Sequence, residues 1–212
     1  MSQVERIIDE LEEQAESDEL EDEETPNIGI IMGSDSDFDV MMGDGDDSVG
    51  AYDALKRLGF EEVTDYYEPP ESRYTFETYV VSAHRTPELM YAYARTAEDR
   101  GIDIIIAGAG GKSADLPNMT ASVAYPVPVI GVPVQEKSVD SVIGMPTGAP
   151  IVATDAGKSF NAALSAAQFL SVTHDDLADR LDEYHDDLKE GVGEVSREMH
   201  ESGTPEFRRR DE

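Results

Sequence analysis

Three residues within one short segment have side chains suited to acid–base chemistry on an anionic substrate: Ser82, His84 and Arg85. An imidazole can give and take a proton near neutral pH, and a guanidinium binds anions. An apolar run precedes these residues, and Thr86 and Pro87, which suit the start of a helix, follow them. The pattern predicts a site where a strand ends and a helix begins. A capped strand–helix turn with an ordinary surface histidine and arginine is the alternative.

Two further loops have the composition of ligand-binding loops. The apolar residues 28–32 run into Ser34, Ser36 and Asp37, whose hydroxyl and backbone donors suit a phosphate; a helix N-cap is the alternative. The apolar residues 102–107 run into a second loop, which consists of Gly108, Ala109, Gly110 and Gly111. Such small residues let a ligand approach the backbone closely. We expect all three loops to meet at one edge of a sheet.

The glycine loop is not a nucleoside triphosphate loop. Gly111, Lys112 and Ser113 match the end of the P-loop motif, but Ile106 stands where the motif needs its first glycine. Because the net charge of the chain is negative and opposes an anionic ligand, we expect Arg85, Lys112 and helix N-termini to supply local positive charge.

Apolar runs alternate with helical patterns along the chain, which predicts the α/β class. The expected strands cover residues 28–32, 75–81, 102–107, 127–132 and 150–154. We expect a three-layer α/β/α domain with a parallel sheet and a C-terminal helix. This catalytic domain is predicted to span 27–190. It is flanked by an acidic extension at 1–26, expected to be disordered, and by a mobile tail at 191–212.

The charge balance limits the partners of the protein. The chain has 47 acidic and 16 basic residues, and its net charge is -31. Such a charge repels nucleic acid and anionic membranes, so we expect neither as a partner. There is no cysteine and no apolar run long enough for a membrane span, and we expect a cytoplasmic protein. The acidity suggests a salt-rich cytoplasm, since the screening length falls to roughly 3 Å at 1 M ionic strength.

An ordered set of motifs resembles one known family. The motifs are Met-Gly-Ser-Asp-Ser-Asp at 32–37, Ser-Ala-His-Arg-Thr-Pro at 82–87, Ala-Gly-Ala-Gly-Gly at 107–111, Leu-Pro at 116–117, Gly-Val-Pro-Val at 131–134, Met-Pro-x-Gly at 145–148 and Asn-Ala-Ala-Leu-x-Ala-Ala-Gln at 161–168. Together they closely resemble the N5-carboxyaminoimidazole ribonucleotide mutase family of purine biosynthesis, also called the phosphoribosylaminoimidazole carboxylase catalytic subunit family. The resemblance covers about residues 28–170.

The resemblance implies a flavodoxin-like fold, a homo-octamer, a ribonucleotide substrate and no metal or organic cofactor. Its implied activity converts N5-carboxyaminoimidazole ribonucleotide to 4-carboxy-5-aminoimidazole ribonucleotide by decarboxylation and recarboxylation, with His84 as the proton shuttle. Functional coupling to the ATP-dependent synthetase of that substrate is also implied. The alternatives are direct carboxylation of aminoimidazole ribonucleotide with carbon dioxide and, more remotely, a non-catalytic nucleotide-phosphate binding module.

Roles for single residues also follow from the resemblance. Arg85 would bind the phosphate, Ser34 and Ser36 would contact the ribose phosphate, and Asp37 would hold the ribose hydroxyls. The residues implied around the imidazole and its carboxylate are Ser82, Gly108, Ala109, Gly110, Gly111 and Leu116. One departure concerns the mutase branch, which often has a second histidine just before Leu-Pro. Here Asp115 occupies that position.

Overall fold

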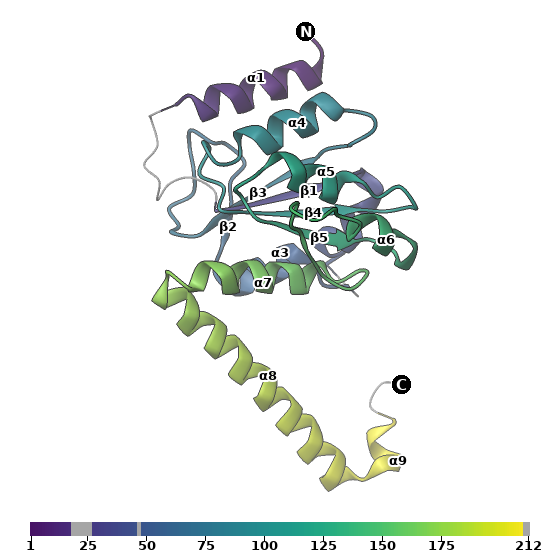
Figure 1. Cartoon of the computed structure of the whole chain (residues 1–212). Coiled ribbons are helices and arrows are strands. Elements are labelled where there is room, and N and C mark those ends of the chain that lie inside the picture. The colour runs from purple at the N-terminus through teal and green to yellow at the C-terminus, as the bar shows by residue number, and fades with distance from the viewer. Residues whose placement is uncertain (18–26, 46–47, 210–212) are drawn as a thin grey trace.

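A computed structural model describes residues 1–17, 27–45 and 48–209 of the chain. Within them, the centre of the molecule is a six-stranded parallel sheet in the order β2-β3-β1-β4-β5-β6 (Figure 1). The strands are β1 (Ile28–Met32), β2 (Glu61–Glu62), β3 (Thr75–Val80), β4 (Ile104–Ala109), β5 (Val129–Pro133) and β6 (Val152–Ala153).

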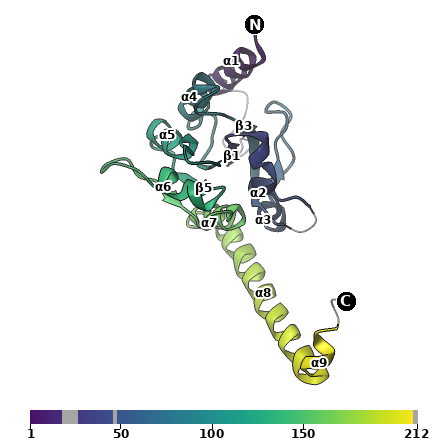
Figure 2. The same ribbon diagram turned by 90° about the vertical axis from the view of Figure 1, so that its right-hand side faces the viewer.

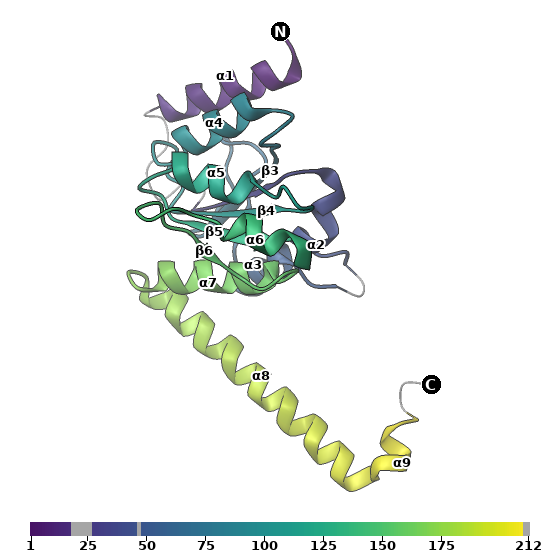
Figure 3. The ribbon, with the colours of Figure 1, turned by 45° about the vertical axis from the view of Figure 1, so that its right-hand side comes forward.

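Helices cover both faces of this sheet, which confirms the predicted three-layer α/β architecture. The helices of one face are α1 (Gln3–Ala15), α4 (Pro87–Thr96) and α5 (Leu116–Val123), and those of the other are α3 (Ala51–Arg57) and α7 (Ser159–Ser171) (Figure 1). The short helical segments are η1 (Asp35–Asp37), α2 (Phe38–Met42), η2 (Glu136–Ser138) and α6 (Val139–Val142). Helix α8 (Asp175–Ser202) extends away from the layers and ends in α9 (Thr204–Phe207) (Figures 2 and 3).

The central strands are apolar throughout because both of their faces are covered. All five residues of β1 and all six of β4 are buried. Side chains alternate along a strand, so Ile30 and Met32 join the core beneath α3 and α7, whereas Ile31 joins the core beneath α4 and α5. A continuous apolar run in the sequence therefore corresponds to two cores, one on each side of the sheet.

The register of the sheet brings the predicted loops to one edge. Met32, the last residue of β1, pairs with Val80 of β3 and with Gly108 of β4. The Gly33 N–H donates to the Gly108 carbonyl at 3.0 Å and continues the ladder. Because all three strands are parallel and end at the same level, the segments that follow them lie beside one another.

Most of the expected strands are confirmed, with shifts at their ends. The expected strand at 102–107 begins at Ile104 and continues to Ala109, and the fifth strand is only Val152–Ala153. The two-residue strand β2 was not expected. Its residues are Glu61 and Glu62, which do not form an apolar run, and it pairs only with β3 at the edge of the sheet.

The prediction of disorder for residues 1–26 is wrong for the part that forms α1. Leu11 and Gln14 are buried where α1 packs on α4. A capping box starts this helix, because the Ser2 hydroxyl accepts from the Glu5 N–H and the Glu5 carboxylate accepts from the Ser2 N–H. The acidic residues 21–24 on which the expectation rested lie outside the described residues. At the other terminus, α8 continues past the expected domain boundary at 190 and includes residues 191–202.

Candidate active site

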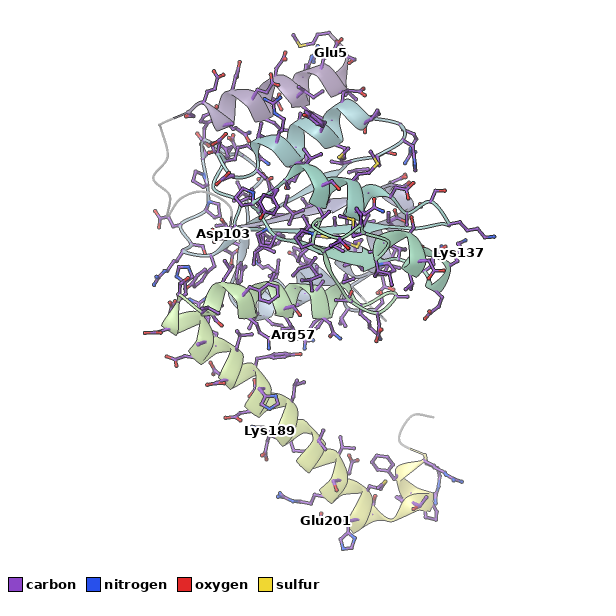
Figure 4. All side chains as sticks on the ribbon, viewed as in Figure 1. Glu5, Arg57, Asp103, Lys137, Lys189 and Glu201 are labelled. Atoms are coloured by element: carbon purple, nitrogen blue, oxygen red, sulfur yellow. The ribbon has the colours of Figure 1, made fainter. Side chains whose placement is uncertain are left out.

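A cavity of about 540 Å³ opens at the carboxyl ends of β1, β3 and β4. Ten of the predicted site residues line it: Ser34, Ser36, Asp37, Ser82, His84, Arg85, Ala109, Gly110, Gly111 and Leu116. They come from three loops that are far apart in the sequence. Figure 4 locates this end of the sheet. Lys137, which lines the cavity, follows β5 and marks the end with the cavity, and Asp103 precedes β4 and marks the opposite end.

The guanidinium of Arg85 is anchored between two of these loops. Its Nη2 donates to the Gly33 carbonyl at 2.8 Å, and its Nε donates to the Ser82 hydroxyl at 3.3 Å. The Arg85 backbone N–H also donates to the Ser82 hydroxyl, at 3.2 Å. These bonds use only part of the five donors of a guanidinium. The remaining donors are available to an anion in the cavity.

The turn between β3 and α4 is held by Thr86, although not as a side-chain cap. Pro87 occupies the first turn of α4, as predicted, but the Thr86 hydroxyl makes no capping bond to that helix. Instead it accepts from the Ser82 N–H at 3.1 Å and donates to the Ser82 carbonyl at 3.2 Å. The loop that carries His84 is therefore closed by its own hydrogen bonds.

The His84 ring contacts a carboxylate from a different loop. Its Nε2 lies 3.1 Å from Oδ2 of Asp115, and the Ser141 hydroxyl donates to Oδ1 of the same carboxylate at 2.6 Å. The side chain of His84 is 58 % exposed and that of Asp115 is 34 % exposed. The imidazole is thus oriented from one side and open to the cavity on the other.

Asp37 is the buried acid of the cavity. Burial raises the pKa of its carboxyl above the ordinary value, and a hydrogen bond from the Gly110 N–H and the positive charge of Arg85 oppose that rise. The side chain is only 6 % exposed. A carboxyl in this position can accept hydrogen bonds from sugar hydroxyls, which lose little on leaving water when they find such a partner.

The glycine loop contributes backbone rather than side chains. A Cβ on Gly110 would lie 2.9 Å from Oδ1 of Asp37, so only glycine leaves room for that carboxylate. Gly111 has a positive φ of 88°, which favours glycine. Gly108, also expected at the site, does not line the cavity. It lies within β4, and the thioether of Met41 packs where its side chain would be.

Sequence reasoning missed several residues of the cavity: Ser113, Asp115, Gln135 and Lys137. Gln135 and Lys137 follow β5, which lies next to β4 in the sheet. Their position just after a predicted strand could have indicated that they reach the same edge as the other loops. Lys112, expected to add positive charge, does not line the cavity, and Lys137 does. The resemblance had placed Asp115 where the mutase branch often has a second histidine, but its contact with His84 could not be predicted, because the two residues are 31 positions apart.

Two further findings concern the residues that the structure describes. No group of three or more His, Asp or Glu side chains there is arranged to hold a metal ion. None of the helices described is both long enough and apolar enough to cross a membrane.

The fold and the cavity together define an α/β protein with a polar cavity, which includes the guanidinium of Arg85, at the carboxyl ends of its central strands. Comparison with known families narrows this class. Residues 27–191 match the family described as AIR carboxylase, where AIR is aminoimidazole ribonucleotide. The chain belongs to the AIR carboxylase family, as its motifs predicted.

Relatives of known name resemble the chain over most of its length. The N5-carboxyaminoimidazole ribonucleotide mutase of Bacillus subtilis is 43 % identical over 182 residues, which are 82 % of this chain and 98 % of that protein. The mutase of Thermotoga maritima is 37 % identical over 188 residues, or 86 % of this chain and 96 % of that protein. The crystal structure of Treponema denticola PurE superposes with a TM-score of 0.63 at 22 % identity, over 82 % of this chain and 98 % of that one, and supports the fold.

Proposed function

We propose that this chain converts N5-carboxyaminoimidazole ribonucleotide to 4-carboxy-5-aminoimidazole ribonucleotide in de novo purine synthesis, and so acts as an isomerase of the mutase type. One observation carries the proposal: in a chain of the AIR carboxylase family, His84 and Arg85 share a cavity with the serine-rich loop and the glycine loop. The Bacillus and Thermotoga relatives, both named as this mutase, match over nearly their whole length.

His84 supplies the two proton transfers of the reaction. Its imidazolium protonates the carbamate nitrogen of the substrate, the N–C bond breaks, and the bonding electrons stay on nitrogen as carbon dioxide leaves. The enamine-like ring carbon then attacks the retained carbon dioxide and forms the new C–C bond. The neutral imidazole takes the proton from that carbon, which restores the aromatic ring. No metal or organic cofactor takes part in these steps.

The other residues hold the substrate in place. Arg85 binds the phosphate with its free donors, and the Ser34 and Ser36 side chains contribute further donors. Asp37 accepts hydrogen bonds from the ribose hydroxyls. The imidazole ring of the substrate and the carboxylate on it lie among Ser82, Ala109, Gly110, Gly111 and Leu116, which line the cavity. This enclosure keeps carbon dioxide near the ring carbon, and proximity of that kind lowers the barrier to its recapture.

Single-turnover assays with two substrates test the proposal. Each assay runs in high salt, one with N5-carboxyaminoimidazole ribonucleotide and the other with aminoimidazole ribonucleotide plus carbon dioxide. We expect rapid product formation from the first substrate. Product from the second substrate alone would overturn the mutase assignment in favour of direct carboxylation. Tight binding with no turnover of either substrate would instead indicate a non-catalytic binding module.

The finer biological setting is also a proposal. We infer a homo-octamer in the cytoplasm, functionally coupled to the ATP-dependent synthetase that makes the carbamate substrate. Coupling is supported by chemistry, since a carbamate on an amine loses carbon dioxide readily and is best consumed where it is formed. Sedimentation analysis of the purified chain tests the octamer, and a monomer at all concentrations would contradict it.

The acidic surface is proposed as an adaptation to a salt-rich cytoplasm. Helix α8 alone carries eleven acidic and three basic residues, and of its side chains only Leu177 is buried. At low ionic strength these charges repel one another, which destabilises the compact state. We expect the melting temperature to fall when KCl is reduced from molar to millimolar concentration. An unchanged melting temperature would contradict this adaptation.

A further inference from the structure

Asp115 occupies a position where an aspartate usually caps a helix, yet it does not do so. It is the residue at the N-cap of α5, and its side chain makes no capping hydrogen bond. A capping carboxylate would accept from backbone N–H groups of the first helical turn. Here Oδ1 accepts instead from the Ser141 hydroxyl, and Oδ2 lies 3.1 Å from Nε2 of His84. The local sequence pattern would assign Asp115 to helix capping, and its contacts point to the cavity.

The carboxylate of Asp115 is held by a second hydrogen bond besides its contact with His84. Ser141 donates to Oδ1 of Asp115 at 2.6 Å, and the Ser141 carbonyl accepts from the side-chain amide of Asn118 at 2.8 Å. Asn118 lies in the first turn of α5, one turn from Asp115 itself. Asn118 of α5 therefore holds the backbone of Ser141, whose hydroxyl bonds the carboxylate. Oδ2 is left to face the imidazole.

We propose that Asp115 is a positioning residue for His84. Its carboxylate accepts the Nε2–H of the imidazole and so holds the neutral ring in the Nε2–H tautomer. The lone pair then lies on Nδ1, and Nδ1 becomes the atom that exchanges protons with the substrate. Ser141 supports this arrangement by orienting the carboxylate.

The exposure of the pair argues for orientation rather than stability. Ion pairs that are open to solvent contribute little to the free energy of unfolding. A hydrogen bond that selects one tautomer, in contrast, decides which nitrogen faces the reacting atoms. The His84–Asp115 contact spans two loops that follow different strands, so its geometry depends on the fold and not on neighbouring residues.

The tautomer can be measured without any substrate. Two-bond ¹H–¹⁵N correlation spectra of the histidine rings, recorded at about pH 9 where ordinary imidazoles are neutral, distinguish the protonated from the unprotonated nitrogen. The His84 signals are assigned from their absence in His84→Asn, and the exposed His185 and His200 serve as internal references. We expect His84 to be protonated on Nε2 in the wild-type protein. Protonation on Nδ1 would overturn the proposal.

Kinetics provide the second test, which rests on the proposed function. For Asp115→Asn we expect kcat to fall about 10²-fold, the loss typical of a misplaced catalytic group, while KM stays near its wild-type value. Ser141→Ala should lower kcat less than Asp115→Asn does. Matched controls are Asp140→Asn, an exposed neighbour outside the cavity, and Ser122→Ala, whose hydroxyl bonds only its own helix. Both controls should keep wild-type kcat.

Several outcomes would contradict the positioning role. An unchanged kcat in Asp115→Asn, or a raised KM with kcat retained, would mean that Asp115 does not act through His84. If Asp115→Asn does not fold, Ser141→Ala and the wild-type spectrum still decide the question. Failure of the proposed function is distinguishable, because a wild-type protein with no turnover of either substrate would still show the predicted tautomer.

Discussion

The Arg100–Glu77 pair and the His84–Asp115 pair join their charged atoms at similar distances but in opposite environments. Nη1 of Arg100 lies 2.9 Å from Oε1 of Glu77, and Nε2 of His84 lies 3.1 Å from Oδ2 of Asp115. In the first pair the side chains are 0 % and 5 % exposed, and in the second they are 58 % and 34 % exposed. Equal geometry therefore does not imply an equal role.

The buried pair sits where α1, β3 and the end of α4 meet. Arg100 also donates to the side chains of Gln14 and Thr96, both at 3.3 Å, and its guanidinium lies 4.9 Å from the centre of the Tyr93 ring. Burial, followed by the charge of Glu77, raises the pKa of the Tyr93 hydroxyl well above its ordinary value, so this ring stays neutral. Each group here depends on the others because none can reach water.

Solvent access distinguishes charged groups that stabilise the fold from charged groups that can react with a ligand. A buried charge that loses its partner is left uncompensated, and the fold bears the full penalty. When one residue of an exposed pair is removed, water solvates the remaining charge, so the free energy of unfolding changes little. The same exposure lets a substrate reach the pair. Four predictions test this contrast.

The largest effect is expected for Glu77→Gln, which leaves the buried Arg100 charge unpaired. We expect the free energy of unfolding to fall by about 3–5 kcal/mol. Denaturant unfolding in high KCl measures this loss, and kcat per folded molecule should stay near wild type. Exposed Glu98→Gln is the matched control. The double variant Glu77→Gln/Arg100→Gln should recover part of the stability, since it buries no charge. If Glu77→Gln were as stable as the wild-type protein, the buried pair would not be needed for stability, which would contradict the distinction drawn here.

His84→Asn should show the reverse pattern. We expect turnover to fall about 10²–10⁴-fold, the usual contribution of a general acid–base group. The free energy of unfolding should change by less than about 1 kcal/mol, as expected for an exposed pair. Steady-state assays and denaturant unfolding of the same preparation measure both quantities, and His185→Asn is the control. Retained turnover, or a stability loss as large as that of Glu77→Gln, would contradict our assignment.

Arg85→Met should weaken substrate binding more than it slows chemistry. Loss of a charge-assisted hydrogen bond of about 1.5–3 kcal/mol corresponds to roughly a 10- to 100-fold rise in Kd. Calorimetric titration with the product ribonucleotide measures the change. Arg85→Lys, which keeps the charge but loses the planar fork, should lie between Arg85→Met and wild type. Arg95→Met, on the exposed face of α4, the helix that follows Arg85, should leave the Kd unchanged.

Asp37→Asn is expected to have a small effect on stability, and the size of this effect depends on pH. Burial raises the pKa of Asp37 above 3.8, so the folded state holds this proton more tightly than the unfolded state does. Asp37 therefore contributes its full stabilisation below pH 3.8, the ordinary pKa that applies to the unfolded chain. This contribution is lost as the pH rises through the pKa of the folded state.

At pH 7 Asp37→Asn should thus melt slightly higher than wild type, by at most about 2–4 °C, the shift that 1 kcal/mol produces in a chain of this size. At pH 3 the difference should vanish, because both side chains are then uncharged. Calorimetric melting in high KCl measures both points. A lower melting temperature for Asp37→Asn at pH 7 would show that its hydrogen bonds outweigh the burial of its charge.

Much of the fold could be predicted because the strongest signals are local. The apolar runs that became β1 and β4 are buried on both faces, and such runs are visible without any partner. The serine-rich loop, His84 and Arg85 could be placed at one sheet edge because parallel strands end at the same side. Ten of the eleven predicted site residues accordingly line one cavity, and Gly108 is the exception because Met41 covers it.

The α/β class, the loops of the cavity and the nature of their donors could be read from the chain, since these follow from local composition and periodicity. Three contacts could not be read in this way: α1 packs on α4, Glu77 neutralises Arg100, and Asp115 faces His84 rather than capping α5. These three contacts join residues at least 20 positions apart. Their formation depends on sheet register and helix packing, which arise from the whole core and leave no pattern near either partner.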